Sequence, residues 1–277
     1  MNKRPMTRVN LDKAIGRLAR NDPRLTVDIR MSVANAIVGQ FLPEGVVKGG
    51  TSLKFRYGAK QARYTMDLDT AWRTDLGTFL KELKSALSGG WEGFSGEVVV
   101  LPQAAPSGIP FDYVMQPCDV KLSYMGRSWC SVRLEIGHNE IGDADEAELM
   151  PVPEDLAQVF SDLCFPVPRG LPLMKLPYQI AQKLHGVTGA NSKRAHDVID
   201  LQLILKNSPD VDLREVRNAC VRLFAYRKGL KWPPRVVKGS DWDVVYRNKK
   251  QNLEVLEDVD AAVAWANDLI VRIDRAR

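Results

Sequence analysis

Hydrophobic residues in the first forty positions recur at helical spacing. Ile29, Val33, Ala36 and Ile37 fall on one face of a helix. The residues Asn-Asp-Pro at 21–23 interrupt the pattern, because proline disrupts a helix interior. The chain is therefore predicted to begin with one or two helices between residues 11 and 40.

Shorter segments alternate hydrophobic and polar residues, which is typical of half-buried strands. In 131–136, for example, Glu135 projects from the face opposite Leu134 and Ile136. The predicted strands are 46–47, 65–71, 97–101, 118–124 and 128–136, and the later predicted helices are 51–57, 75–87, 177–187, 193–205, 213–226 and 259–273. This order predicts an α+β fold, in which helices flank a mixed sheet and a mostly helical part follows.

A cluster of prolines separates these two parts. Five prolines lie between residues 151 and 172, and beyond them the pattern becomes helical. We place the boundary near Pro168, which gives an α/β domain over 1–168 and a helical domain over 169–277.

Composition narrows the class of protein. The 277 residues contain 45% hydrophobic and 26% charged residues, as in ordinary globular domains. No apolar run approaches the length of a membrane span, and the N-terminus lacks the apolar segment of a secretory leader, so we expect a cytoplasmic protein without membrane contact. The four cysteines and three histidines lack the spacing of zinc ligands.

The net charge of +5 conceals an uneven distribution. Residues 1–63 hold 13 Lys and Arg against 4 Asp and Glu, and residues 169–250 hold 17 against 7, whereas 137–168 hold 8 acids and no base. Basic segments of this kind indicate a surface for an anionic polymer such as RNA, although solvated basic helices would give the same pattern.

The main candidate site begins at Lys48. Gly49 and Gly50 leave room for a ligand, and the backbone N–H groups at the start of the helix that follows, which includes Thr51, can bind phosphate. Lys48 itself is a candidate cation beside that phosphate.

A strand with two alternate carboxylates follows the glycines. Asp67, Asp69 and Thr65 are predicted to share one face, while Met66 and Leu68 face the core. Two carboxylates side by side suit Mg²⁺ bound to substrate phosphates. Each motif alone occurs in ordinary turns and strand ends, and only their combination favours a site.

A second group of candidates lies in the helical part. Asp197 shares a helix face with Leu201 and Ile204, and Asp200 borders that face. A carboxylate among apolar neighbours requires a partner, and Lys183 on the preceding helix is the candidate. A lysine at a helix edge and an aspartate near a helix N-terminus are the ordinary alternatives.

These motifs resemble those of the DNA polymerase β-like nucleotidyltransferases, and more closely those of the AbiEii/AbiGii family of bacterial toxins. The matching residues are Lys48 to Leu53, Tyr57, Gly58, Arg63 to Asp69, Ile180 to His185 and Arg194 to Leu201. The 16 residues between the glycines and Asp67 exceed the usual spacing of the superfamily and favour the narrower family.

The resemblance implies a polymerase β-like domain whose active site is completed by the helical domain. It implies a metal-dependent enzyme in which Asp67 and Asp69 bind two Mg²⁺ ions, Glu135 is the third carboxylate, with Asp119 as runner-up, and Lys183 and Asp197 contribute to catalysis. It also implies that an NTP is bound by Lys48, Gly49, Gly50, Thr51, Arg63, Thr65 and Asp200.

The resemblance further implies transfer of a nucleoside monophosphate to RNA, most plausibly the 3′ end of tRNA, by a toxin with a cognate antitoxin or a role in phage defence. The alternatives are a protein or small-molecule acceptor, transfer of the γ-phosphate, or nucleic-acid binding without catalysis. Trp232, Trp242 and Tyr246 could stack on unpaired bases, although packing within the helical domain is their more common use.

Overall fold

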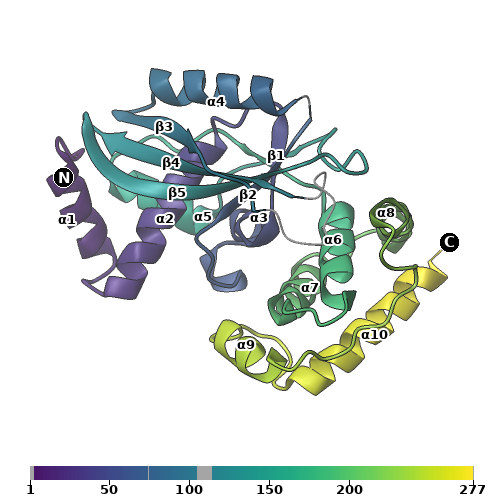
Figure 1. Cartoon of the computed structure of the whole chain (residues 1–277). Coiled ribbons are helices and arrows are strands. Elements are labelled where there is room, and N and C mark those ends of the chain that lie inside the picture. The colour runs from purple at the N-terminus through teal and green to yellow at the C-terminus, as the bar shows by residue number, and fades with distance from the viewer. Residues whose placement is uncertain (1–2, 74, 105–113, 277) are drawn as a thin grey trace. The chain divides into compact units, whose positions relative to one another are not determined.

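The computed structural model describes residues 3–73, 75–104 and 114–276, which form two compact units (Figure 1). The first unit comprises Met1–Gly58, Thr65–Asn139 and Ala147–Leu173. The second comprises Ala59–Tyr64, Glu140–Glu146 and Met174–Arg277. The main boundary thus follows Leu173, a few residues beyond the expected Pro168, and two short earlier segments belong with the helical unit.

Among the described residues, a mixed seven-stranded sheet forms the centre of the first unit, in the order β3-β4-β5-β2-β1-β7-β6. Its strands are β1 (Gly45–Lys48), β2 (Leu68–Trp72), β3 (Phe94–Val100), β4 (Gln116–Tyr124), β5 (Arg127–Gly137), β6 (Glu148–Met150) and β7 (Leu171–Leu173). The β2 strand pairs antiparallel with β1 and parallel with β5. The three strands that carry the candidate residues are therefore neighbours.

Helices cover both faces of this sheet. They are α1 (Arg8–Leu18), α2 (Pro23–Gly39), α3 (Gly49–Tyr57), α4 (Leu76–Gly89) and α5 (Glu154–Asp162). Figure 1 shows α4 on one face and α2, α3 and α5 on the other. The predicted apolar faces are buried, with Val33, Ala36 and Ile37 of α2 fully inaccessible to solvent.

The entry into β2 differs from the prediction. The strand begins at Leu68 rather than Thr65, and Met66 is 45% exposed instead of facing the core. The backbone carbonyl of Met66 accepts a hydrogen bond from Asn35 Nδ2 at 3.2 Å, and that of Asp67 accepts one from Thr51 Oγ1 at 2.5 Å. Side chains rather than a neighbouring strand hold this segment, so strand alternation does not apply to it.

Several short elements were not predicted. The α5 helix lies within the proline-containing stretch, with Pro153 at its N-cap, and β6 and β7 are each three residues long. Prolines that punctuate a loop also commonly precede the first turn of a helix, so the same residues fit both interpretations.

The second unit is helical, as predicted. It contains a 3₁₀ turn (Ala59–Gln61), α6 (Leu176–Thr188), α7 (Ala195–Asn207), α8 (Leu213–Arg227), α9 (Trp242–Lys249) and α10 (Val259–Arg275). The α6 helix packs on α7 and α8. In the described part of the chain, no helix has the length and apolar character needed to cross a membrane.

Candidate active site

The glycine pair lies where β1 passes into α3. Gly49 has a φ of +69°, a backbone conformation that residues other than glycine rarely adopt. A Cβ atom at this position would also collide with the carboxylate of Asp69. The turn therefore requires glycine both for its backbone and for its space, and it places the Asp69 carboxylate against the start of α3.

The start of α3 can accept an anion. Lys48 is the N-cap residue, and its side chain forms no capping hydrogen bond. The first backbone N–H groups of a helix have no partner within the helix, so they can donate to a phosphate. Gly50 and Thr51 complete this first turn and are both buried.

The candidate charges lie in one row across three strands. Lys48 on β1 is paired in register with Asp69 on β2, and Asp69 is paired with Glu135 on β5. Residues directly opposite each other on neighbouring strands project from the same face of a sheet, about 5 Å apart. The register thus brings together residues separated by up to 87 positions of sequence.

Lys48 reaches along this row toward the end of β5. Its side chain is buried, and its Nζ atom would lie 2.7 Å from a Cβ atom added at Gly137. Gly137 follows Glu135 by two residues, so both positions share one face of β5. The glycine therefore leaves space for the ammonium group, a feature that the sequence patterns did not single out.

The carboxylates of this face repel one another. Burial, and then the negative charges of Asp69 and Asp67, raise the pKa of Glu135 above its ordinary value, while Arg133 and Lys48 oppose the shift. Asp67 is exposed and Asp69 is half-buried. Among the described residues, no group of three or more His, Cys, Asp or Glu has the arrangement of a metal site made by the protein alone.

Asp119, the alternative third carboxylate, lies elsewhere on the sheet. It is on β4 opposite Arg133, whose Nη1 atom is 3.3 Å from its Oδ1 atom. The register places Pro117, not Asp119, next to Glu135. This geometry favours Glu135 as the carboxylate that accompanies Asp69.

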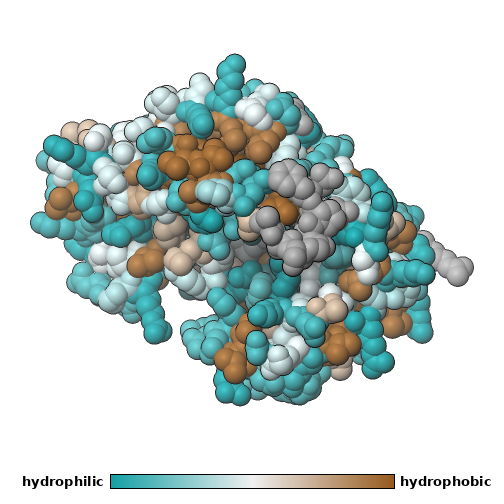
Figure 2. All heavy atoms as spheres, viewed as in Figure 1, coloured by the Kyte–Doolittle hydropathy of each residue, from teal (hydrophilic) through white to brown (hydrophobic). Residues whose placement is uncertain are grey.

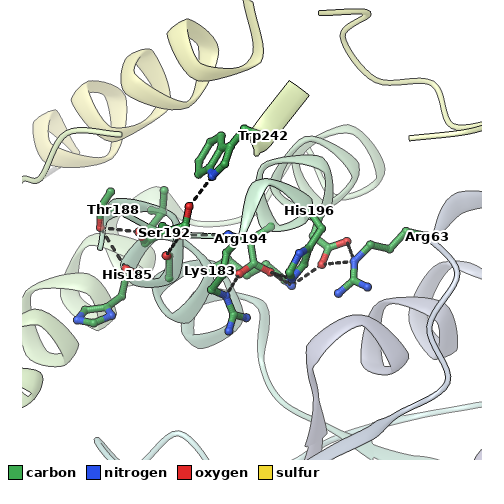
Figure 3. A network of polar contacts seen from close by, with 12 residues as sticks. Arg63, Lys183, His185, Thr188, Ser192, Arg194, His196 and Trp242 are labelled. Atoms are coloured by element: carbon green, nitrogen blue, oxygen red, sulfur yellow. Dashed lines mark hydrogen bonds and ion pairs between the residues drawn. The ribbon is translucent and has the colours of Figure 1, made fainter. Parts of the chain in front are cut away.

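The second unit contains a buried network of charges (Figure 3). Lys183 Nζ lies 3.2 Å from Asp197 Oδ1 and 2.6 Å from Asp200 Oδ2, which confirms the predicted pairing. Asp197 also binds Arg194 Nε at 2.5 Å, and Asp200 binds Arg63 Nε at 3.0 Å. Lys183 and both aspartates are buried, so this network links α6, α7 and the segment that contains Arg63.

Ion pairing and burial shift the pKa values of two residues in this network. Burial alone would raise the pKa of Asp197, but Lys183 and Arg194 outweigh it and hold that pKa below its ordinary value. Burial lowers the pKa of the adjacent His196 to about 4, so this histidine is neutral at pH 7. The predicted part of Lys183, Asp197, Asp200 and Arg63 in the active site stays a prediction, because these contacts by themselves describe a structural network.

Two of the aromatic residues considered for base stacking are inaccessible. Trp242 and Tyr246 are 0% and 1% exposed. Trp242 Nε1 donates to the carbonyl of Ser192 at 2.6 Å, and Tyr246 forms hydrogen bonds with Gln202 and Leu256. Stacking of bases on these two rings is therefore wrong as a hypothesis, and packing is their use.

A glycine turn at a helix start and a lateral row of carboxylates are features of enzymes that bind nucleotides. The family model described as "Nucleotidyl transferase AbiEii toxin, Type IV TA system" matches residues 33–269. The chain belongs to the AbiEii family. AbiEii proteins are nucleotidyltransferase toxins of type IV toxin–antitoxin systems, so an NTP substrate and an antitoxin partner follow from membership.

One solved structure supports the fold, and a second is similar to a lesser degree. MenT4, a nucleotidyltransferase toxin from Mycobacterium tuberculosis, matches with a TM-score of 0.51 and 18% identity over 95% of this chain and 98% of its own. JHP933 from Helicobacter pylori matches with a TM-score of 0.42 and 15% identity, over 87% of this chain and 88% of its own. No curated protein sequence matches the chain.

Two residues that shape the candidate site were missed in the sequence. Asn35 holds the Met66 carbonyl, and Gly137 makes room for Lys48. Asn35 was hidden within an apolar helix pattern, where a polar residue is the only signal. Gly137 ends the same strand that carries Glu135, and a glycine there could have indicated a close approach by another group.

Proposed function

We propose that this protein transfers a nucleoside monophosphate from an NTP to the 3′-hydroxyl of an RNA acceptor, with tRNA as the preferred substrate. The single observation that carries the proposal is the row of Lys48, Asp69 and Glu135 beside the glycine turn at Gly49. In this reaction the acceptor oxygen bonds to the α-phosphorus, and the bond from that phosphorus to the pyrophosphate oxygen breaks.

The first turn of α3 is suited to the triphosphate. Gly49, Gly50 and Thr51 would present backbone N–H groups to phosphate oxygens, while the Lys48 ammonium, held over Gly137, would offset their charge. Thr51 Oγ1 donates to the Asp67 carbonyl, so it would position the carboxylate segment rather than bind the nucleotide through its hydroxyl. Thr65, which precedes β2, is a further candidate contact.

Divalent metal ions fit the chemistry of the carboxylates. Asp67 and Asp69 would hold Mg²⁺, and oxygen atoms of the triphosphate would complete its coordination. When bound, Mg²⁺ neutralises charge on the phosphates and lowers the pKa of an attacking hydroxyl. Glu135, whose pKa is raised, would accept the proton of that hydroxyl.

An RNA acceptor is supported by charge. The chain carries a net charge of +5, with its basic residues concentrated in 1–63 and 169–250. Phosphate contacts by Lys and Arg supply most of the affinity for nucleic acid, and they attract a polyanion to the protein from a distance.

The test is a transfer assay with the intact protein. Wild type and Asp67→Ala are incubated with Mg²⁺, total bacterial RNA and each α-³²P NTP in turn, and the RNA is resolved on a denaturing gel. We expect label in a tRNA-sized band with wild type, lost by at least a hundredfold in Asp67→Ala. Label that appears in protein or small molecules, or that arises only from γ-³²P NTP, would overturn the proposal.

A further inference from the structure

A groove of about 530 Å³ lies along the outer face of α1. It is lined by Arg8, Val9, Asp12, Lys13, Gly16, Arg17 and Asn21. Leu11 and Ile15 on the opposite face of the helix are fully buried, so α1 is fixed to the first unit by one side and open on the other. In the space-filling view, the surface over α1 is mainly hydrophilic (Figure 2).

The groove carries uncompensated positive charge. Asp12, its one acidic residue among those described, is shared by Arg8 at 3.3 Å and Arg30 at 3.0 Å. Lys13 and Arg17 are exposed, and no acidic side chain of the described chain lies within 4.0 Å of either. Since Lys13 and Arg17 are four residues apart, they are neighbours on the helix surface.

Gly16 forms the floor between these cations. Glycine in a helix interior weakens the helix relative to alanine, so its presence needs a reason. Packing does not supply one, because a Cβ atom at Gly16 would meet only Asn21 Oδ1, at an ordinary 3.6 Å. A glycine that the protein's own packing does not require suits the close approach of a ligand.

The groove lies beside β5, the strand that carries Glu135, but it is distant from the candidate active site. Asp12 accepts a hydrogen bond from Trp129 Nε1 at 3.1 Å, so α1 lies beside the start of β5, whereas Glu135 lies near its end. Six strand residues at about 3.3 Å each give a separation of roughly 20 Å. A polymer longer than a few nucleotides could therefore reach both places.

We infer that the α1 groove is a docking surface for the phosphate backbone of the RNA acceptor, which holds the body of the RNA while its 3′ end lies at Glu135. The inference rests on the proposed function. It adds a second contact region to that function, and this region lies before residue 33, where the match to the AbiEii family model begins. The partner is a polyanion, because cations flank a floor that has no side chain.

Binding and transfer are measured separately with the full chain. Binding of a fluorescent tRNA transcript is followed by anisotropy at several salt concentrations, without NTP. We expect Lys13→Gln/Arg17→Gln to weaken binding at least tenfold and to reduce the slope of log K against log salt by about 1.5, as for two lost phosphate contacts. Gly16→Leu, which fills the floor without changing charge, should also weaken binding at least threefold.

The matched control is Lys81→Gln/Lys84→Gln on α4. Both lysines are exposed, lie in the same unit and have no acidic partner within 4.0 Å in the described chain. The control should bind within twofold of wild type. Equal losses in both double variants would indicate general attraction to a basic protein and overturn the inference, as would full binding by Lys13→Gln/Arg17→Gln.

Transfer distinguishes the two proposals. The ratio of kcat/KM for full-length tRNA to that for a four-nucleotide acceptor should fall at least tenfold in Lys13→Gln/Arg17→Gln and stay within twofold in the control. If wild type labels RNA but this ratio does not change, the docking surface fails while the proposed function stands. If wild type labels no RNA, the proposed function fails. Weaker tRNA binding by Lys13→Gln/Arg17→Gln than by the control would then still identify the groove as an RNA site, and equal binding would rule it out. Capture of an acidic protein by α1 with no RNA binding would overturn the inference.

Discussion

The carboxylate of Asp69 fills the space that a side chain at Gly49 would need. The two residues are separated by 20 positions, yet the antiparallel pairing of β1 and β2 brings them together at the start of α3. The glycine turn and the carboxylate strand are therefore structurally coupled, and a change at either is expected to disturb both.

Gly49→Ala tests this dependence. The substitution forces alanine into a left-handed conformation, which costs about 1–2 kcal/mol, and displaces the Asp69 carboxylate. We expect a lower melting temperature and a loss of nucleotidyl transfer of at least a hundredfold, measured with labelled NTP.

Gly89→Ala in α4 is the control for this prediction. Nothing lies within 4 Å of a Cβ atom at Gly89, and its φ is not in the left-handed region. This variant should keep wild-type activity and gain stability of about 0.5–1 kcal/mol. Equal activity in Gly49→Ala and Gly89→Ala would show that the contact between Gly49 and Asp69 has no functional consequence.

The buried charges of the second unit make a prediction about stability. Lys183→Met removes the cation shared by Asp197 and Asp200, and each carboxylate keeps one guanidinium partner. Because removal of a partner from a buried ion pair is strongly destabilising, we expect a loss of about 3 kcal/mol in the free energy of unfolding by urea.

The exposed pair of Lys206 and Glu254 provides the comparison for Lys183. Lys206→Met should unfold at the same urea concentration as wild type, since exposed ion pairs contribute little. If Lys183→Met and Lys206→Met unfold at the same urea concentration, the buried ion pairs of Lys183 contribute no more to stability than an exposed pair.

His196 predicts how stability depends on pH. Its pKa is lowered by burial to about 4 in the folded protein, against about 6.5 when unfolded. The unfolded chain therefore takes up the proton first, so the contribution of His196 is fully present above pH 6.5 and is lost as the pH falls toward 4. The charges around it are those of Asp197, Arg63, Arg194 and Asp200.

Urea unfolding at pH 7 and pH 5 measures this effect. From pH 7 to pH 5, the free energy of unfolding should fall less in His196→Gln than in wild type, by about 1–2 kcal/mol. Asp197 does not add to this difference, because ion pairing holds its pKa well below its ordinary value. If the free energy of unfolding falls equally in His196→Gln and in wild type from pH 7 to pH 5, His196 is already solvated in the folded protein.

Much of the fold was predictable because its long elements are strongly periodic. The helices around Val33, Leu83 and Ile180 and the hairpin of β4 and β5 follow directly from spacing. The elements that were missed are the helices α5 and α9 and the strands β6 and β7, and these two strands, at three residues each, are too short to carry a pattern.

The candidate site was predictable as a set of residues but not as a geometry. Asp67 and Asp69 stood out by type and spacing, and Glu135 through the family resemblance, whereas the register of Asp69 with Glu135 depends on which strands become neighbours. The irregular entry to β2 illustrates the limit. Thr51 donates a hydrogen bond to the carbonyl of Asp67, and Asn35 donates one to that of Met66. No local sequence pattern predicts these hydrogen bonds. Arg63, one of the partners of Asp200, likewise lies 137 residues away in the sequence.

Glu135 and Asp119 can be distinguished by paired substitutions. Glu135 lies in register with Asp69, while Asp119 lies beside Arg133, so Glu135→Gln should lower transfer at least a hundredfold and Asp119→Asn at most a few-fold. Glu135→Gln should also raise the melting temperature without divalent cation, because it removes a half-buried charge that Asp69 and Asp67 repel. Saturating Mg²⁺ should raise the melting temperature of wild type more than that of Asp67→Asn. Loss of transfer in Asp119→Asn with retention in Glu135→Gln would move the third carboxylate to β4, and the row across β1, β2 and β5 would then no longer define the active site.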